Sequence, residues 1–202
     1  MIININDFSL DEIARKAVET IRAGKIVVVP FDTVYGFVAN PRDERAISDL
    51  NQLKGRPETK TIGTAVSSVV DLLEITDGCE KFIEFVKSKT PGPFTFICKD
   101  NPQNGISKLC KRDNNIGVRI PDNSLILKIA KLSGGVIAQT SANKSGQPNC
   151  YSLDELFKQY DRPFIENKSA VGLVIDGGVL PANPPSQLWD LTGNTPSKIE
   201  RN

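Results

Sequence analysis

The sequence predicts an α/β fold, and three observations support this prediction. Short β-branched runs bounded by Gly or Pro, such as KIVVVP at residues 25–30, alternate with segments whose apolar residues recur at helical spacing. Two Ser-x-x-Glu capping boxes, which begin at Ser9 and Ser152, mark the starts of helices. The chain has 202 residues, of which 39% are hydrophobic and 24% charged, as is typical of one globular domain. Alternation of this kind predicts a sheet covered by helices and leaves the order and direction of the strands open.

The first half of the chain begins with a helix that starts at the Ser9 capping box and stops at Gly24, because apolar residues recur every three or four positions between them. KIVVVP follows as a buried strand that Pro30 ends, and PFDTVYGF leaves it as an extended or turning loop. A second helix over residues 43–53 has one apolar face and is closed by Gly55.

The same alternation predicts the remaining elements. Runs rich in β-branched and aromatic residues predict strands at residues 62–66, 94–98, 115–120, 135–139, 173–176 and 187–191. Helical spacing of apolar residues predicts helices at residues 68–73, 79–88 and 125–131, and one from the capping box at Ser152. The Pro-rich segment PANPPSQ, from Pro181, is expected to be a surface loop.

Composition excludes several classes of protein. The chain has no histidine, which excludes histidine-dependent catalytic triads and histidine metal sites, so we expect no metal held by the protein itself. Its four cysteines form no CxxC pair and are expected to be free thiols. No signal peptide and no run of about 18 apolar residues occurs, so a cytoplasmic protein without a membrane anchor is expected. The net charge of +1 argues against a generally cationic nucleic-acid binder, so any basic site must be local.

The segment KGRPETK carries three cations just beyond the second helix. Lys54 and Arg56 flank Gly55 and Lys60 follows, so all three can point from one turn at a polyanion. The alternative is a solvated loop, because basic residues at the C-terminus of a helix are also favoured by the helix dipole.

Hydrogen-bonding side chains follow the predicted strand GVIAQ. They are Thr140, Ser141, Asn143, Lys144 and Ser145. Ligands of open α/β sheets collect beyond the carboxyl ends of strands, so these groups are well placed to bind a nucleotide or a small acid. The alternative is that Asn and Ser simply form a turn.

GVRIPDN places Arg119 in an otherwise apolar strand. Burying a guanidinium without a partner is costly, so we expect Arg119 to face an anion or a groove, where it could clamp a carboxylate or phosphate. The alternative is an arginine on an edge strand, in water or paired with a local carboxylate.

PFDTVYGF offers the hydroxyl of Thr33, the phenol of Tyr35 and, at Gly36, room for the close approach of a ligand. The alternative is a turn that caps the core. Asp32 is a single carboxylate, which does not make a metal site, and it is expected to orient a neighbouring cation or the backbone.

Together these segments resemble the YrdC-like domain family over about residues 9–201. The motifs that carry the resemblance, in the order and spacing of the family, are PFDTVYGF, KGRPETK, TPGPFTFI, GVRIP, TSANKSGQPN, VIDGG, PSQLWDLT and KIER. The resemblance implies one domain over residues 1–202, a twisted mixed β-sheet with flanking helices around a basic concave cavity. Because the chain stops at Asn202, no linker and no additional C-terminal domain are expected.

The resemblance also implies an activity, that of an L-threonylcarbamoyladenylate synthase. Such an enzyme converts L-threonine, bicarbonate or CO2 and ATP into threonylcarbamoyl-AMP and pyrophosphate. A separate tRNA threonylcarbamoyl-transferase complex then modifies adenosine 37 of tRNAs that read ANN codons. Mg²⁺ is expected to accompany ATP without a dedicated protein cage. Direct contact with tRNA or double-stranded RNA is left open.

The resemblance assigns roles to individual residues. Threonine would be held by Thr33, Arg119, Thr140 and Ser186. ATP would be met by Arg56, Lys60, Ser141, Asn143 and Arg201. Lys54 and Arg56 are the expected catalytic residues, with Lys54 adding charge near the reacting groups. Lys54 and Arg56 are expected on one wall of a nucleotide cavity, with Ser141 and Asn143 on the opposite wall.

Four residues depart from the family pattern. Phe31 stands where threonine is usual, Thr61 where proline is usual, Ala65 where many members have histidine, and Gln187 where threonine is usual. These departures keep open a divergent relative that adenylates another carbamoyl-type acid. A second alternative is a non-catalytic module that binds tRNA or double-stranded RNA, although the cations cluster among small hydroxyl residues instead of spreading over a surface.

Overall fold

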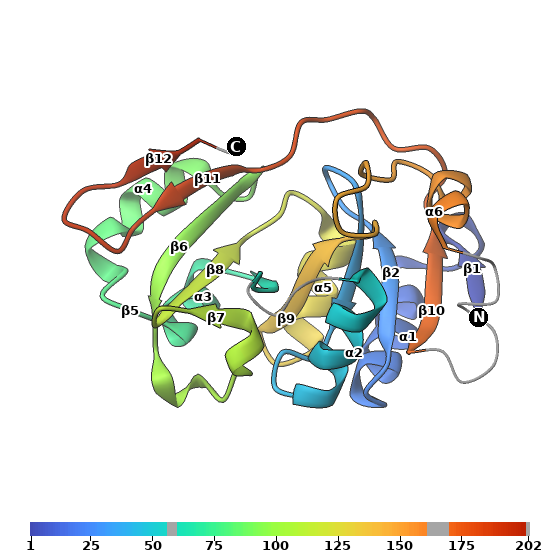
Figure 1. Cartoon of the computed structure of the whole chain (residues 1–202), viewed down its shortest axis with the longest axis horizontal. Coiled ribbons are helices and arrows are strands. Elements are labelled where there is room, and N and C mark those ends of the chain that lie inside the picture. The colour runs from blue at the N-terminus through green and yellow to red at the C-terminus, as the bar shows by residue number, and fades with distance from the viewer. Residues whose placement is uncertain (56–59, 161–169, 201–202) are drawn as a thin grey trace.

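A computed structural model of the chain describes residues 1–55, 60–160 and 170–200, and one twisted sheet runs through the whole of it (Figure 1). The strands are β1 (Ile2–Asn4), β2 (Ile26–Pro30), β3 (Tyr35–Ala39), β4 (Gly63–Val66), β5 (Thr76–Asp77), β6 (Phe94–Asp100), β7 (Lys111–Arg112), β8 (Asn115–Arg119), β9 (Val136–Ser141), β10 (Val171–Asp176), β11 (Gln187–Asp190) and β12 (Ser197–Ile199). Their order is β1-β10-β2-β3-β9-β4-β8-β6-β11-β12, and β5 and β7 pair with β6 and β8 outside this order. The sheet is mixed, because β2 is parallel to β10 and antiparallel to β3.

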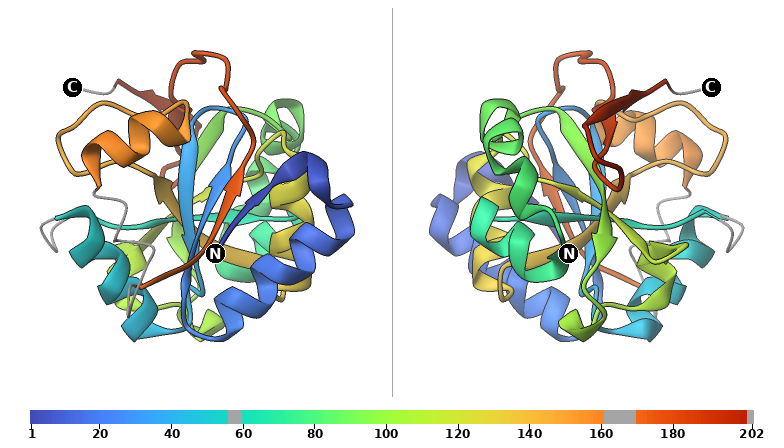
Figure 2. Two further views of the ribbon diagram at one scale, coloured as in Figure 1. Left: turned by 90° about the vertical axis from the view of Figure 1, so that its right-hand side faces the viewer. Right: turned by 90° about the vertical axis from the view of Figure 1, so that its left-hand side faces the viewer.

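Helices cover both faces of the sheet, as Figure 2 shows from two sides. The α-helices are α1 (Leu10–Arg22), α2 (Glu44–Lys54), α3 (Val69–Ile75), α4 (Ile83–Lys89), α5 (Ser124–Leu132) and α6 (Leu153–Gln159). Short 3-10 helices are η1 (Ile5–Asp7), η2 (Glu80–Phe82), η3 (Pro102–Asn104) and η4 (Lys108–Cys110). The predicted class, α/β with a twisted mixed sheet and flanking helices, is therefore confirmed.

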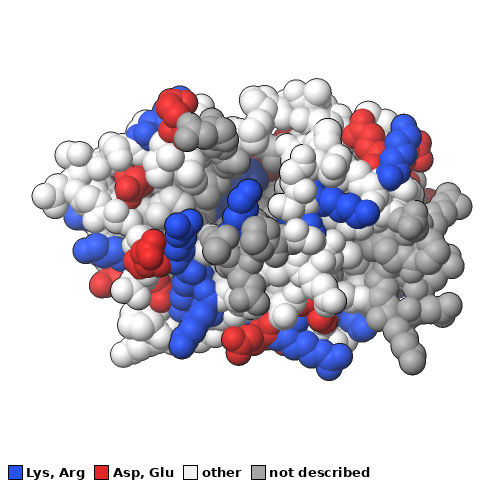
Figure 3. Space-filling view, in the orientation of Figure 1, with Lys and Arg blue, Asp and Glu red and all other residues white. Residues whose placement is uncertain are grey.

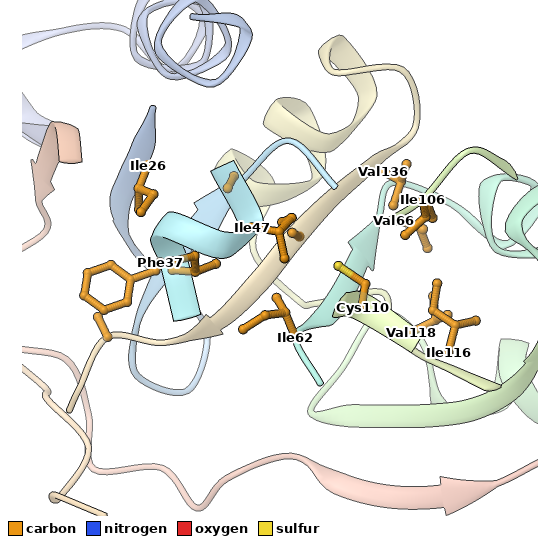
Figure 4. Close-up of a cluster of buried hydrophobic side chains, with 14 of the residues drawn as sticks. Ile26, Phe37, Ile47, Ile62, Val66, Ile106, Cys110, Ile116, Val118 and Val136 are labelled. Atoms are coloured by element: carbon orange, nitrogen blue, oxygen red, sulfur yellow. The ribbon is translucent and has the colours of Figure 1, made fainter. Parts of the chain in front are cut away.

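The alternation of side chains along β2 divides the core into two clusters. Val27 and Val29 face α1 and α5 in one cluster, whereas Ile26 and Val28 belong to the larger cluster on the other face. The larger cluster includes Phe37 and extends across the sheet, as Figure 4 shows. All five residues of β2 are buried, which explains why it appears in the sequence as a continuous apolar run.

Local signals in the sequence place most element boundaries correctly. Ser9 and Glu12 form the predicted capping box at the start of α1. Asp43 caps α2, and Gly55 ends that helix with a left-handed φ of 57°, where a glycine is favoured. Ser152 caps α6 as predicted. The segment at 181–186 lies outside regular structure, as expected of a surface loop.

Two predictions of secondary structure were wrong or incomplete. PFDTVYGF is not simply a loop, because Tyr35–Ala39 forms β3, a buried strand between β2 and β9. The predicted helix at residues 79–88 is split into η2 and α4. The short strands β1, β5, β7 and β12 were not predicted, since each is only two or three residues long.

The four cysteines are buried free thiols, in agreement with the sequence. Burial raises the pKa of Cys110 to about 12 and that of Cys150 to about 11, which keeps these two thiols protonated and unreactive at neutral pH. Among the residues that the structure describes, none of the helices combines the length and apolar character needed to cross a bilayer.

Candidate functional site

A cavity of about 580 Å³ lies where the ends of β2, β8 and β9 meet the starts of β6 and β11. The described residues that were predicted as site residues all line it, and they are Thr33, Lys54, Lys60, Arg119, Thr140, Ser141, Asn143 and Ser186. Arg56 and Arg201 lie outside the described residues. Figure 3 shows basic side chains at the hollowed centre of one face of the molecule. The topology therefore brings segments from the whole length of the chain to one concave site.

The charge of the cavity is of one sign. Its described lining contains the cations Lys54, Lys60 and Arg119, together with hydroxyl and amide side chains, and no aspartate or glutamate. A concave surface of this kind attracts anions and offers neutral donors to orient them. Over the described ranges, no group of three or more carboxylate or thiol side chains is arranged to hold a metal ion.

Lys54 is the last residue of α2 and is only 4% exposed. Its Nζ donates hydrogen bonds to the main-chain oxygen of Ser141 at 2.5 Å and to that of Asn143 at 2.7 Å. It also donates to Oδ1 of Asn143 at 3.2 Å. The expectation that Lys54 faces Ser141 and Asn143 from an opposite wall is therefore wrong, because the three residues are in direct contact on one wall.

Asn143 organises the loop after β9 around this contact. Its Oδ1 accepts a hydrogen bond from the hydroxyl of Ser141 at 2.6 Å, and its Nδ2 donates to the main-chain oxygen of Gln147 at 2.6 Å. In return, the main-chain N–H of Ser145 donates to the main-chain oxygen of Lys54 at 2.8 Å. The turn interpretation and the binding interpretation of TSANKSG are thus compatible, because the same residues close the loop and line the cavity.

Arg119, at the end of β8, is buried in an ion pair. Its Nη2 donates to both carboxylate oxygens of Asp32, at 2.8 and 2.9 Å, and the exposed fractions of the two side chains are 5% and 10%. The carboxylate offsets the cost of burying the guanidinium. β8 is an interior strand, so the alternative of an arginine on an edge strand is excluded, whereas the expected cavity and a carboxylate partner are both present. Asp32 orients this cation, which is one of the two roles expected of it from the sequence.

Phe31 occupies the space above Gly36. A Cβ built on Gly36 would lie 2.5 Å from Cε2 of the Phe31 ring, so the ring requires a glycine there. Gly36 is itself a lining residue, so the expectation that a ligand approaches closely here stays a prediction. The Phe31 ring also lies 5.8 Å from the guanidinium carbon of Arg119.

Tyr35 is fully buried and is not among the lining residues, so its phenol is not part of the cavity. Its hydroxyl donates to the main-chain oxygen of Gly178 and accepts from the N–H of Gly177, both at 2.9 Å. Burial raises the pKa of Tyr35 to about 12. Tyr35 anchors the start of the segment at 177–186, which connects β10 to β11 and crosses the top of the molecule in Figure 1.

Ser186 ends this connecting segment beside the cavity. Its hydroxyl lies 2.8 Å from that of Thr95, another lining residue. Thr95, Gln139 and Asn149 were not predicted as site residues, although each lies within a motif already singled out in the sequence. Their position beside the cavity depends on the tertiary fold, which the sequence does not show. The only signal in the sequence was that each of them belongs to one of these motifs.

The four residues that depart from the family pattern lie in different environments. Phe31 and Thr61 line the cavity. Ala65 is fully buried in the same hydrophobic cluster as Phe31 and is paired with Arg119 across β4 and β8. Gln187 is exposed and does not line the cavity, so its departure leaves the described lining unchanged.

Known proteins resemble this chain in sequence and in structure. The Sua5/YciO/YrdC family model, described as "Telomere recombination", matches residues 19–202. Mouse threonylcarbamoyl-AMP synthase is 33% identical over 174 residues, which are 83% of this chain and 56% of the relative. The synthase of Vibrio campbellii is 26% identical over 180 residues, 87% of this chain and 92% of the relative.

The crystal structure of P. abyssi Sua5 complexed with L-threonine superimposes with a TM-score of 0.84 at 28% identity, covering 98% of this chain and 56% of that one. The chain thus spans little more than half the length of the mouse relative and of P. abyssi Sua5. Since the family model extends over nearly the whole sequence, the chain belongs to the Sua5/YciO/YrdC family.

Proposed function

We propose that the protein is a threonylcarbamoyl-AMP synthase, which forms threonylcarbamoyl-AMP and pyrophosphate from L-threonine, bicarbonate or CO2, and ATP. The observation that carries the proposal is the cavity, whose described lining has three cations and no carboxylate. At neutral pH threonine carries a carboxylate, ATP a triphosphate and bicarbonate one negative charge, whereas CO2 is neutral. A site that gathers anions, lined also by hydroxyls and amides, matches this set of substrates.

The proposed reaction needs no nucleophile from the protein. The amine of threonine attacks CO2, or CO2 formed when bicarbonate takes up a proton and loses water, and gives a carbamate while a proton leaves the nitrogen. A carbamate oxygen then attacks the α-phosphorus of ATP, and the bond from that phosphorus to the bridging oxygen of pyrophosphate breaks. Catalysis consists of holding these anions together and stabilising the charge that develops on the leaving pyrophosphate.

The residues divide into two sets in this proposal. Thr33, Arg119, Thr140 and Ser186 hold threonine, with the guanidinium of Arg119 facing the carboxylate. Lys60, Ser141 and Asn143 meet ATP, together with Arg56 and Arg201. The contacts of Lys54 support a role in which it both adds positive charge and holds the Ser141–Asn143 wall in place.

Mg²⁺ enters this proposal as a companion of ATP. The described cavity lining has no carboxylate, and the carboxylate of Asp32 is paired with Arg119, so the donor set favours an ion held by the triphosphate and water. The product would pass to a tRNA threonylcarbamoyl-transferase complex in the cytoplasm, where tRNA and ATP are both available.

Release of pyrophosphate from ATP tests the proposal. Purified protein with Mg²⁺ should release pyrophosphate only when threonine and bicarbonate are both present, and threonylcarbamoyl-AMP should be detected by mass spectrometry. Omission of either co-substrate is the control. Release that ignores both would contradict the proposal, and release with a different amino acid would favour a divergent relative. Binding of tRNA without any turnover would favour the RNA-binding alternative.

A further inference from the structure

We propose that Asp32 is a positioning residue of this site, which fixes the guanidinium of Arg119 in the orientation that receives the carboxylate of the amino-acid substrate. The identity of that substrate rests on the function proposed above. The placement of Asp32 rests on the structure alone. Asp32 is itself absent from the cavity lining, so it acts through Arg119 and not by touching the substrate.

The ion pair restrains the guanidinium strongly. Both carboxylate oxygens of Asp32 accept from one nitrogen, Nη2 of Arg119, at 2.8 and 2.9 Å. A second donor, the main-chain N–H of Asp122, lies 3.3 Å from Oδ2 and holds the carboxylate from the other side. Because the guanidinium is planar and its Nη2 is held by Asp32, the directions in which its other N–H groups point are restricted.

The main chain of Asp32 is fixed as well. Its carbonyl oxygen accepts a hydrogen bond from Nδ2 of Asn183 at 2.9 Å, which ties the turn after β2 to the segment at 177–186. Thr33 follows Asp32 in this turn, and Ser186 ends the segment that contains Asn183. Asp32 therefore connects the three elements that carry Thr33, Arg119 and Ser186, the groups that we assign to threonine.

Two effects of Asp32 on substrate binding oppose each other. Its negative charge repels the substrate carboxylate, so a purely electrostatic role predicts tighter binding when the charge is removed. Its hydrogen bonds preorganise Arg119, so a positioning role predicts weaker binding when they are lost. The sign of the change in threonine affinity therefore separates the two roles.

The variant Asp32→Asn tests the proposal, because it keeps the size of the side chain and removes its charge. We expect the KM for threonine to rise about tenfold or more, while the KM for ATP stays within about twofold, since one charge-assisted anchor is lost at one subsite only. The matched control is Asp113→Asn, which makes the same change of charge at an exposed aspartate that does not line the cavity. It should leave both KM values within about twofold of the parent.

A readout without substrate makes the test independent of the proposed function. In ¹⁵N-labelled protein, the Nη signals of Arg119, assigned by their loss in Arg119→Lys, should exchange with water about tenfold faster or more in Asp32→Asn, because Nη2 makes both hydrogen bonds to Asp32. A thermal melt of each variant checks that the fold survives. If Asp32→Asn proves unfolded, Asn183→Ala removes the main-chain anchor instead, and the same rise in the threonine KM is expected.

The outcomes distinguish the two proposals. Threonine-dependent turnover in the parent, with an equal or lower threonine KM in folded Asp32→Asn, overturns the positioning role and leaves the proposed function standing. A parent protein that ignores threonine overturns the proposed function. In that case an unchanged Nη–H exchange rate in Asp32→Asn overturns the positioning role, and a faster rate supports it.

Discussion

Lys54 donates hydrogen bonds to Asn143 twice, at 2.7 Å to the main-chain oxygen and at 3.2 Å to Oδ1. The two residues are 89 positions apart in the sequence. The contact joins the C-terminus of α2 to the loop that follows β9, so the two motifs richest in predicted ATP contacts form one unit. Lys54 therefore holds the two motifs together, and under the proposed function it would also supply positive charge to the cavity.

Replacing Lys54 by methionine should therefore reduce both turnover and stability. The variant keeps the length of the side chain but leaves the main-chain oxygens of Ser141 and Asn143 without this donor, at a cost of about 1 to 3 kcal/mol in the free energy of unfolding. Turnover should fall about a hundredfold or more, because the wall moves and a positive charge is lost. Urea unfolding and pyrophosphate release measure the two effects. Lys108→Met, at an exposed lysine, is the control, and full activity in Lys54→Met would show that the site lies elsewhere.

Gly36 should not tolerate even one methyl group. In Gly36→Ala the new Cβ would lie 2.5 Å from the ring of Phe31, a residue of the cavity lining, so the ring must move. We expect a loss of about 1 to 3 kcal/mol in the free energy of unfolding and a higher KM for threonine. Gly117→Ala is the matched control, because it lies on a strand of the same cavity and its Cβ would meet Ile97 at an ordinary 3.5 Å. Equal effects of the two substitutions would contradict this account.

The sequence predicts those elements of the fold whose signals are local. The capping box at Ser9, the cap at Asp43 and the left-handed Gly55 each act within a few residues, and each marks the boundary that the structure has. β3 was missed because its stability comes from pairing with β2 and β9, the latter about a hundred residues away, and no local pattern reports such a partner.

The candidate site shows the same division. The residue types at the ends of the strands predicted anion binding, and those predicted site residues that the structure describes line one cavity. The contacts of these residues could not be predicted from the sequence, because the pairing of Arg119 with Asp32 depends on where β8 and the turn after β2 lie in the sheet. The role of Tyr35 was misjudged for a related reason: its phenol, which appeared available for a ligand, is already hydrogen-bonded to the segment at 177–186.

Tyr35 should make stability fall at alkaline pH. Its pKa is raised to about 12 in the folded protein, against about 10 for an ordinary tyrosine, so the folded state disfavours the tyrosinate. The contribution of the protonated phenol to stability is complete below pH 10 and is lost as the pH rises from about 10 to about 12. Tyr35→Phe should be less stable at neutral pH by about 1 to 2 kcal/mol, because Gly177 loses its acceptor. It should also lose less stability than the parent over this alkaline range. Urea midpoints at a series of pH values measure both effects, and parallel curves for the two proteins would contradict the assignment.

Phe31 and Ala65 should depend on each other energetically. They belong to one buried cluster, and both adjoin Arg119, Phe31 through its ring and Ala65 through strand pairing. Ala65→His alone forces a larger polar side chain into a fully buried position and should cost about 1 to 3 kcal/mol in the free energy of unfolding. Phe31→Thr alone removes most of a ring and should cost about 3 kcal/mol or more.

The double variant decides whether the large residue at 31 and the small residue at 65 fill a shared space. If they do, Phe31→Thr makes room for the imidazole, and the double variant should be more stable than the sum of the single losses predicts, by about 1 kcal/mol or more. Urea unfolding of the parent, both single variants and the double variant gives the coupling energy. The same four proteins, assayed for the KM of threonine, show whether the pair also sets the affinity of the subsite beside Arg119. Losses of stability that simply add would mean that the two positions vary independently and that Phe31 is not a substitute for the missing histidine.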